Sequence, residues 1–219
     1  MSGPIVVINP NANAEVTAAI DASVAPLRVP GGPTIECLTS PDGPFGVQSQ
    51  ADADAAVAPL IEIVKSRPDA SAFVLACFSD PGIDDCRAAT DAPVFGIQES
   101  GLLAAFARGA LVGVIAIAAP SIDRHRRYMR RMGVLNRIAN ERALNISVAD
   151  SARGGGVLER MIEVGRLLIE DGAEAIVMGC AGMAAQRAPL EEALGVPVIE
   201  PTYAATLMAL GEVLRDRGR

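Results

Sequence analysis

Apolar runs alternate along the chain with segments whose apolar residues recur at helical spacing. The runs are rich in β-branched residues and nearly continuous, as in strands that helices cover on both faces, and this alternation is typical of parallel βαβ units. The predicted strands lie at 5–8, 34–38, 73–76, 94–96, 112–118, 144–148, 175–179 and 198–199. The predicted helices lie at 14–23, 46–66, 83–89, 101–108, 121–132, 156–171, 184–193 and 203–217.

The two halves of the chain repeat one arrangement. Cys77 follows the predicted strand at 73–76, and Cys180 follows the one at 175–179. A helical stretch comes after each cysteine, and Pro93 and Pro197, 16 and 17 residues beyond, open the next strand. Four strands and four helices in each half predict an α/β fold made of a duplicated open sheet. We expect residues 1–98 to form the first lobe and 99–202 the second, with the helix at 203–217 packing back on the first.

Composition and charge exclude several classes of partner. A net charge of −7 argues against a nucleic-acid surface, which needs clustered cations. The one basic run, 124–131, is interpreted as a solvated helix face, with Ile122, Met129 and Met132 turned inward and His125 exposed. No apolar run is long enough to span a membrane, and the first residues carry no leader-type segment, so we expect a cytoplasmic protein with reduced thiols.

Cofactor motifs are missing from the sequence. The four cysteines include no C-x-x-C pair, which disfavours zinc and dithiol redox sites. Neither a phosphate loop nor a Gly-x-Gly-x-x-Gly turn is present, and with no Trp, five Phe and two Tyr a base-stacking platform is not expected. We therefore expect no metal and no cofactor, and a small molecule as the partner. So apolar a chain is also compatible with a homo-oligomer.

Polar or small-residue turns follow four of the predicted strands, at 9–11, 77–80, 179–182 and 200–202. Ligands of open α/β sheets bind at the carboxyl ends of the strands, so facing lobes would bring these turns to one cleft. Cys77 and Cys180 would then be two thiols able to move a proton from one face of a carbon to the other. A following helix would favour the thiolate of each. The alternative, a small buried hydrophobe, is preferred for Cys37 and Cys86.

The same two turns supply candidate substrate-binding groups. The backbone N–H groups of Phe78, Ser79, Ala181 and Gly182 could hold a carboxylate or stabilise an enolate. Small neighbours on either side of the cysteines would let a substrate approach the backbone closely.

Several polar side chains have two interpretations. Asn9 and Asn11 could hold a ligand carbonyl or cap the helix that follows, and the ligand role is preferred for Asn9. Ser79 and Asp80 could bind substrate or cap the next helix. Glu99 could begin a helix or support the site from behind.

Three motifs carry a resemblance to a known family. Val-Ile-Asn-Pro-Asn at 7–11, Ala-Cys-Phe-Ser-Asp-Pro-Gly at 76–82 and Gly-Cys-Ala-Gly-Met at 179–183 resemble the hydantoin racemase branch of the aspartate/glutamate racemase superfamily. The similarity spans nearly the whole chain. It implies two pseudo-symmetric Rossmann-like lobes, each a mostly parallel four-stranded sheet flanked by helices, with a cofactor-independent site between them. It also implies that one of Cys77 and Cys180 removes the proton of a stereocentre and the other returns it from the opposite face.

The substrate remains open between several alternatives. Arylmalonate decarboxylases look like relatives that lack one of the paired cysteines, so the presence of both favours a racemase or epimerase. Its substrate would be a 5-substituted hydantoin, allantoin or an acidic amino acid. A maleate isomerase-like or decarboxylase-like enzyme acting on a small dicarboxylate, and a non-catalytic binder, are the competing hypotheses. The sequence departs from the family at 12–13, 98–100 and 118–145, which bears on the substrate more than on proton transfer.

Overall fold

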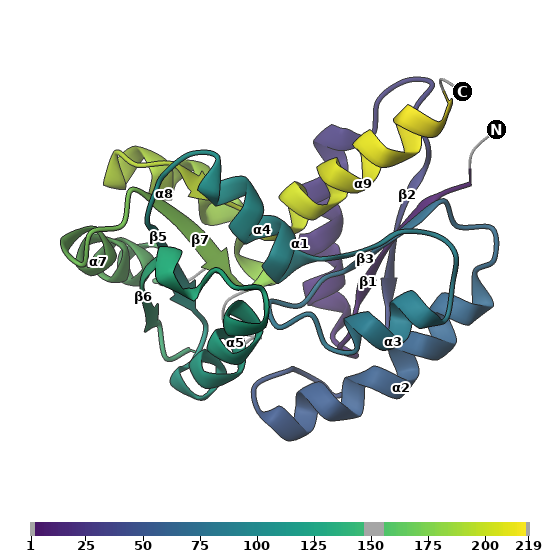
Figure 1. Ribbon diagram of the computed structural model, residues 1–219, viewed down its shortest axis with the longest axis horizontal. Helices are drawn as coiled ribbons and strands as arrows, with labels where there is room; N and C mark the ends of the chain where they lie inside the picture. Colours follow the sequence, from purple (N-terminus) through teal and green to yellow (C-terminus); the bar gives the residue numbers. More distant parts are fainter. Residues whose placement is uncertain (1–2, 147–155, 218–219) are drawn as a thin grey trace.

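Two lobes, each built on a four-stranded parallel sheet, make up the computed structural model, which describes residues 3–146 and 156–217 (Figure 1). The first sheet has the order β2-β1-β3-β4 and the second the order β6-β5-β7-β8. The identical strand order confirms the duplicated α/β fold. The strands are β1 (Ile5–Asn9), β2 (Ile35–Thr39), β3 (Ala72–Leu75), β4 (Val94–Gly96), β5 (Val112–Ala116), β6 (Ile138–Ala143), β7 (Ala175–Gly179) and β8 (Val198–Ile199).

The first sheet is covered on both faces because its strands alternate between two apolar layers. Ile5 and Val7 of β1 face α1 (Ala14–Val24) and α9 (Pro201–Arg217). Val6 and Ile8 face α2 (Gln50–Ser66) and α3 (Ile83–Ala88), which lie on the opposite side of the sheet (Figure 1). All four side chains are fully buried, and β1 is one of the two inner strands of this sheet.

The second sheet follows the same plan. Val177 of β7 lies against α4 (Ile97–Phe106), and Gly113 of β5 lies under Leu168 of α7 (Val157–Glu170). The remaining helices of this lobe are α5 (Ala119–Arg131), which follows β5, and α8 (Arg187–Leu194), which packs beside β8. Short 3-10 helices occur at η1 (Ala25–Leu27), η2 (Leu135–Arg137) and η3 (Ala181–Gln186).

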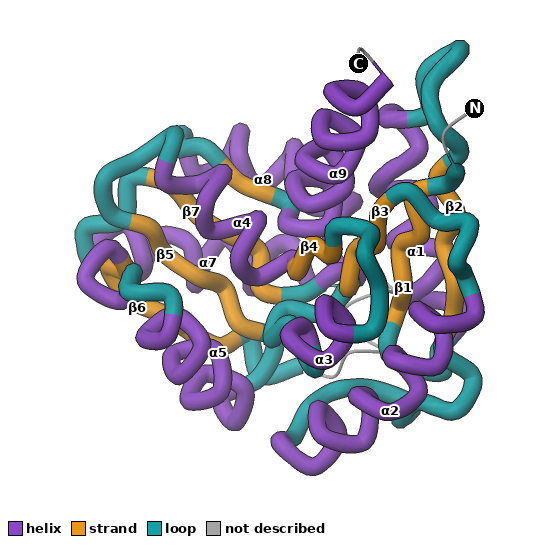
Figure 2. The backbone as a smooth tube through the Cα atoms, turned by 45° about the vertical axis from the view of Figure 1, so that its right-hand side comes forward, coloured by secondary structure: helices purple, strands orange, loops and turns teal. Residues whose placement is uncertain are grey.

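Three helices join the lobes. α9 leaves β8 of the second sheet, packs along α4 and reaches β1, β3 and β4 of the first sheet, while α1 of the first lobe packs on η3 of the second. One apolar core therefore continues through both lobes, and Figure 2 shows the two groups of strands held together by these helices. This packing brings the carboxyl ends of β3 and β7 to the same region of the molecule.

The prediction of a strand at 144–148 is wrong: the strand is β6, Ile138–Ala143, and residues 147 and 148 lie outside the described part of the chain. β6 is an edge strand in which only Ile138 and Glu141 are buried. An edge strand with one partly solvated face carries polar residues, so it does not stand out as an apolar run.

The predicted start of a helix at residue 101 is also too late, since α4 begins at Ile97. The N–H groups of Gln98 and Glu99 in its first turn are capped by Asp80, which lies 18 and 19 residues before them at the end of the β3 turn. Because the capping residue does not lie directly before the helix, the sequence around residue 97 contains no N-cap signal that would predict where α4 begins.

Candidate active site

The Cys77 turn begins where β3 ends. The carbonyl oxygen of Cys77 accepts hydrogen bonds from the N–H groups of Ser79, at 2.8 Å, and Asp80, at 3.0 Å. Asp80 has a φ of 44° and Gly82 a φ of 64°, so the chain reverses twice before α3 begins at Ile83. Cys77 therefore does not sit at a helix N-terminus, and the predicted stabilisation of its thiolate by a following helix is wrong.

The Cys180 turn is tighter. Gly179 closes β7 so near to β5 that a Cβ at this position would lie 2.5 Å from the carbonyl oxygen of Ile115. Cys180 follows in an extended conformation, with φ −161° and ψ 140°, and directly precedes η3. Because η3 packs against α1 of the other lobe, this turn is held over the carboxyl edge of the first sheet.

Both cysteines line one cavity between the lobes. Each thiol is partly buried and reduced. The cavity measures about 30 Å³, about the volume of one water molecule in the liquid. Its walls are formed by Asn11, Val16, Val47, Ala76, Cys77, Phe78, Ser79, Ile117, Ser121, Arg124, His125, Gly179, Cys180 and Ala181.

Burial sets the protonation of Cys77. Desolvation raises the pKa of this thiol to about 11, although the Ser79 hydroxyl, with Oγ 3.4 Å from Sγ, and the positive charge of Arg124 act in the opposite direction. The nearby Cys180 and Asp80 raise the pKa further. Cys77 is therefore a neutral thiol at pH 7 in this structure.

The two asparagines of the first turn have different places. Asn9 is fully buried, and its Nδ2 donates to Oδ1 of Asn11 (3.1 Å), the carbonyl oxygen of Asn13 (3.1 Å) and Oγ1 of Thr17 (2.9 Å). Asn13 caps α1. Asn9 thus stabilises the turn through its hydrogen bonds, and Asn11 is the asparagine that lines the cavity.

Asp80 and Gly182 also lie off the cavity wall. The Asp80 carboxylate accepts the N–H groups of Gln98 and Glu99, each at 2.9 Å, so it ties the Cys77 turn to α4. Burial raises the pKa of Asp80 to about 7, with these two hydrogen bonds opposing the rise. A side chain on Gly96 would collide with it, because a Cβ there would lie 2.2 Å from Cγ of Asp80.

Of the four residues whose backbone N–H groups were predicted to bind substrate, three line the cavity and Gly182 does not. Phe78, Ser79 and Ala181 line the cavity. The N–H of Ser79 is already bonded to the carbonyl oxygen of Cys77. The N–H of Phe78 makes no backbone hydrogen bond within residues 3–146 and 156–217, which leaves it available on the wall beside Cys77.

Arg124 is a cavity residue that the sequence analysis missed. Its side chain belongs to the basic run at 124–131 but is 8% exposed. Its Nε and Nη1 are buried and have no hydrogen-bond partner in the described chain. The prediction that this run is a wholly solvated helix face is wrong at this position, although Arg127, Arg130 and Arg131 are exposed.

His125 is buried as well, at 2% exposed, so the prediction of an exposed histidine is wrong. Its Nδ1 lies 2.5 Å from Oε1 of the buried Glu141, and its ring meets that of Phe78 edge-on, with centroids 5.1 Å apart. Nε2 of Gln98 donates to its carbonyl oxygen at 3.0 Å. One signal could have found both residues: α5 starts at the carboxyl end of β5, where ligands of such sheets bind.

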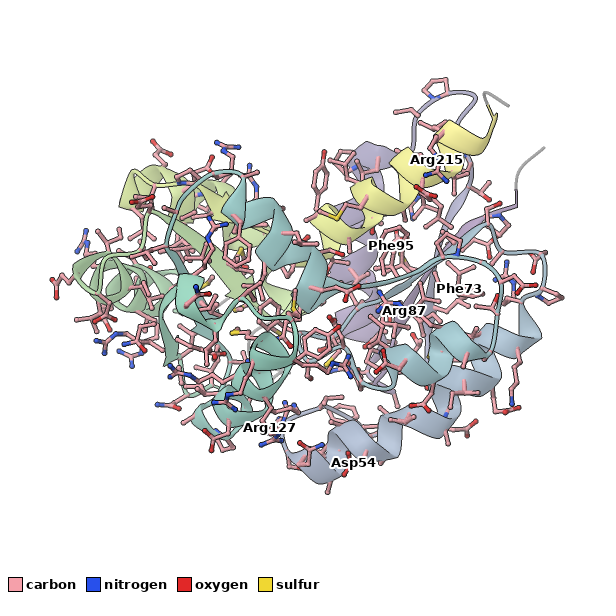
Figure 3. All side chains as sticks on the ribbon, in the orientation of Figure 1. Asp54, Phe73, Arg87, Phe95, Arg127 and Arg215 are labelled. Atoms are coloured by element: carbon pink, nitrogen blue, oxygen red, sulfur yellow. The ribbon has the colours of Figure 1, made fainter. Side chains whose placement is uncertain are left out.

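The outer face of α5 bridges the lobes. Tyr128 donates to Oε2 of Glu99 at 2.7 Å, and Arg131 pairs with Asp84 of α3 at 2.6 Å. Arg127 donates to Oε1 of Gln50 at 2.6 Å, and Figure 3 shows Arg127 facing α2, near Asp54. These contacts hold α5 in place beside the cavity, which its residues Ser121, Arg124 and His125 help to line.

Comparison with known proteins identifies the family. A profile described as Asp/Glu/Hydantoin racemase matches residues 5–209. The chain belongs to this family. The resemblance seen in the three sequence motifs is thereby confirmed, and with it the expectation of an enzyme of the isomerase class.

Individual family members align over nearly the full chain. A hydantoin racemase of Paenarthrobacter aurescens is 35% identical over 220 residues, covering 94% of this chain and 92% of its own. A hydantoin racemase of Pseudomonas sp. (strain NS671) is 33% identical, covering 98% and 87%. An allantoin racemase from Klebsiella pneumoniae has a similar structure, with a TM-score of 0.90 at 28% identity, over 99% of this chain and 89% of its own.

Residues 3–146 and 156–217 contain no group of three or more His, Cys, Asp or Glu side chains placed to hold a metal ion. Within the same ranges, no helix has the length and apolar character needed to cross a bilayer.

Proposed function

We propose that this racemase-family member inverts the stereocentre of a cyclic ureide, a 5-substituted hydantoin or allantoin, by proton transfer between Cys77 and Cys180. The observation that carries the proposal is that both thiols line one cavity from equivalent strand ends of the two lobes. The relatives named hydantoin racemase and allantoin racemase support this substrate class.

The chemistry needs two groups that act on opposite faces of one carbon. One cysteine, as thiolate, removes the proton beside the ring carbonyl, and the electron pair of the C–H bond moves into an enolate. The other cysteine, as thiol, delivers its proton to the opposite face and becomes the thiolate. The N–H of Phe78, which makes no backbone hydrogen bond in the described chain, stands beside Cys77, where it could donate to the developing oxyanion.

Substrate binding requires the cavity to widen. At about 30 Å³ it is smaller than a five-membered ring with a side chain. The contacts of α5 with α2, α3 and Glu99 are polar and partly exposed, so they can open without breaking the apolar core between α1, α4 and α9. A reducing, cytoplasmic setting would keep both thiols active.

The test is solvent-deuterium exchange followed by NMR. Enantiopure 5-benzylhydantoin, allantoin, aspartate and glutamate are incubated with the reduced protein in D₂O, and optical rotation is recorded in parallel. We expect exchange with loss of rotation for a hydantoin or allantoin. Cys77→Ala and Cys180→Ala should each abolish racemisation, while one enantiomer in each variant can still exchange its proton. Cys86→Ala, which removes a buried thiol away from the cavity, is the matched control.

The other outcomes point elsewhere. Wild-type racemisation in both Cys77→Ala and Cys180→Ala would refute the two-cysteine mechanism. A substrate adduct trapped on one thiol, with no α-proton exchange, would indicate an isomerase or decarboxylase of small dicarboxylates. Tight binding of a ligand without exchange or product would indicate a non-catalytic binder.

A further inference from the structure

Arg124 places a buried positive charge in the cavity wall, and two of its three guanidinium nitrogens are buried without a hydrogen-bond partner among the described residues. Nε and Nη1 have no hydrogen-bond partner in the described chain, and the side chain is 8% exposed. A buried cation without a partner is destabilising, and such groups are normally paired. Its position beside both thiols indicates that the missing partner belongs to the reaction.

The charged groups around Arg124 are already engaged. Asp52 of α2 is near enough to feel the charge, but its carboxylate accepts the N–H groups of Gln48 and Ser49 at the start of that helix. Glu141, on β6, is hydrogen-bonded to His125. Arg124 also lines an outer cleft with Asp54, Asp80 and Tyr128, and each of these three is already hydrogen-bonded, to Gln50, to the start of α4 and to Glu99 respectively. Among the described residues that line the cavity itself, the two cysteines are the acidic groups that face the guanidinium.

We propose that Arg124 is the counter-ion of the single negative charge that travels through the reaction, and that it binds the substrate carbonyl oxygen as this becomes the enolate oxygen. This inference rests on the proposed function. It names a further catalytic residue, and it narrows the substrate to a molecule that is neutral when it binds.

The charge is conserved at each stage. Before transfer, one cysteine is a thiolate and the other a thiol. When the thiolate takes the α-proton, an S–H bond forms, the C–H pair becomes the enolate, and both sulfurs are neutral. When the second thiol gives up its proton, the enolate pair forms the new C–H bond and the negative charge ends on that sulfur. One fixed cation within reach of all three positions stabilises each state.

The net charge of the cavity also indicates the class of substrate. Arg124 and one thiolate together are neutral, so a neutral ring such as a hydantoin completes the site without further charge. A carboxylate substrate would add a second negative charge to the cavity, and Arg124 is the only Arg or Lys side chain among the described lining residues. Amino acids and dicarboxylates are therefore disfavoured.

The test compares Arg124→Gln and Arg124→Lys with Arg130→Gln, a control on the exposed face of the same helix. Steady-state racemisation of L- and D-5-benzylhydantoin gives kcat and KM. Arg124→Met, which removes the buried charge, is included to show by thermal unfolding that the fold is retained. In parallel, the pH dependence of iodoacetamide alkylation at Cys77 and Cys180 is followed by peptide mass spectrometry, which reports on the thiols without any turnover.

We expect Arg124→Gln to lower kcat by about 100-fold or more with KM changed less than fivefold, because a neutral carbonyl binds the guanidinium weakly and an enolate binds it strongly. Arg124→Lys should recover part of kcat. The alkylation midpoint of at least one cavity thiol should move to higher pH in Arg124→Gln and stay unchanged in Arg130→Gln.

Three results would overturn the inference. A value of kcat/KM within threefold of wild type in Arg124→Gln would exclude the role in catalysis. A loss confined to KM, with carboxylates inhibiting only the proteins that retain Arg124, would show that Arg124 holds a carboxylate. A wild-type protein without racemase activity would instead refute the proposed function, and the neutral substrate with it. In that case, an alkylation midpoint that is the same in Arg124→Gln as in wild type would also exclude the coupling of Arg124 to the thiols.

Discussion

Replacing Asp80 with Asn tests how the Cys77 turn is anchored. The carboxylate is 3% exposed and accepts the first N–H groups of α4 from Gln98 and Glu99. Asn has almost the same shape and tolerates the positive φ of 44° that Asp80 adopts. The substitution therefore removes the titration of this site while leaving the backbone of the turn unstrained.

The magnitude follows from the pKa. Burial raises the pKa of Asp80 from an ordinary value of 3.8 to about 7, so folding favours the protonated acid. A raised folded-state pKa contributes stability that is complete below the unfolded-state pKa and is lost as the pH rises through 7. From these two pKa values, proton linkage gives a loss of about 2.5 kcal/mol in the free energy of unfolding between pH 5 and pH 8. The Asn variant lacks this contribution.

The assay is urea unfolding followed by circular dichroism at pH 5 and pH 8. Wild type should lose about 2.5 kcal/mol more than Asp80→Asn over this interval, since all the other titratable groups are present in both proteins. Asp85→Asn, an exposed acid on the adjoining helix, should behave as wild type. An equal pH dependence in wild type and Asp80→Asn would refute the reasoning, because it would mean that Asp80 titrates normally in the folded protein.

Three further changes have defined outcomes. Gly113→Ala should destabilise the protein by about 1–3 kcal/mol in urea unfolding, since the new Cβ would lie 2.9 Å from Cβ of Leu168 and 3.0 Å from Cβ of Ala173. Unchanged stability would show that α7 can shift away from β5 at no cost. Tyr128→Phe removes the 2.7 Å bond to Glu99 and should cost about 1 kcal/mol. It should also speed hydrogen exchange in α5, and unaltered exchange there would argue against α5 as the closing element. In the wild type, iodoacetamide should modify Cys77 at a rate that still climbs between pH 8 and pH 10, because the pKa of this thiol is about 11; a plateau below pH 9 would contradict that value.

Much of the architecture can be predicted from short stretches of the sequence. Buried parallel strands are nearly continuous apolar runs, so β1, β3 and β7 could be placed within a residue or two. The rule that ligands bind at the carboxyl ends of such strands then directed attention to the turns after β3 and β7. Cys77 and Cys180 were found in this way, and both line the cavity.

What the sequence left undecided depends on partners far along the chain. β6 is a polar edge strand, and α4 starts early because Asp80, from another turn, caps it. The burial of His125 requires Glu141 on a different strand, and no window of sequence around residue 125 contains that partner.

The sequence by itself determined the alternation of strands and helices, the duplication and the two cysteine turns, because each is a property of neighbouring residues. Only the tertiary structure decided which polar groups face the cavity. The side chains of Asn9 and Asp80 make hydrogen bonds within the structure that shapes the turns, so they do not face the cavity. Arg124 points into the protein, whereas the other arginines of α5 are exposed or partly exposed. Periodicity assigns a residue to one side of a helix, but only the packing of α5 across both lobes determines which part of that side is solvent and which is the cavity wall.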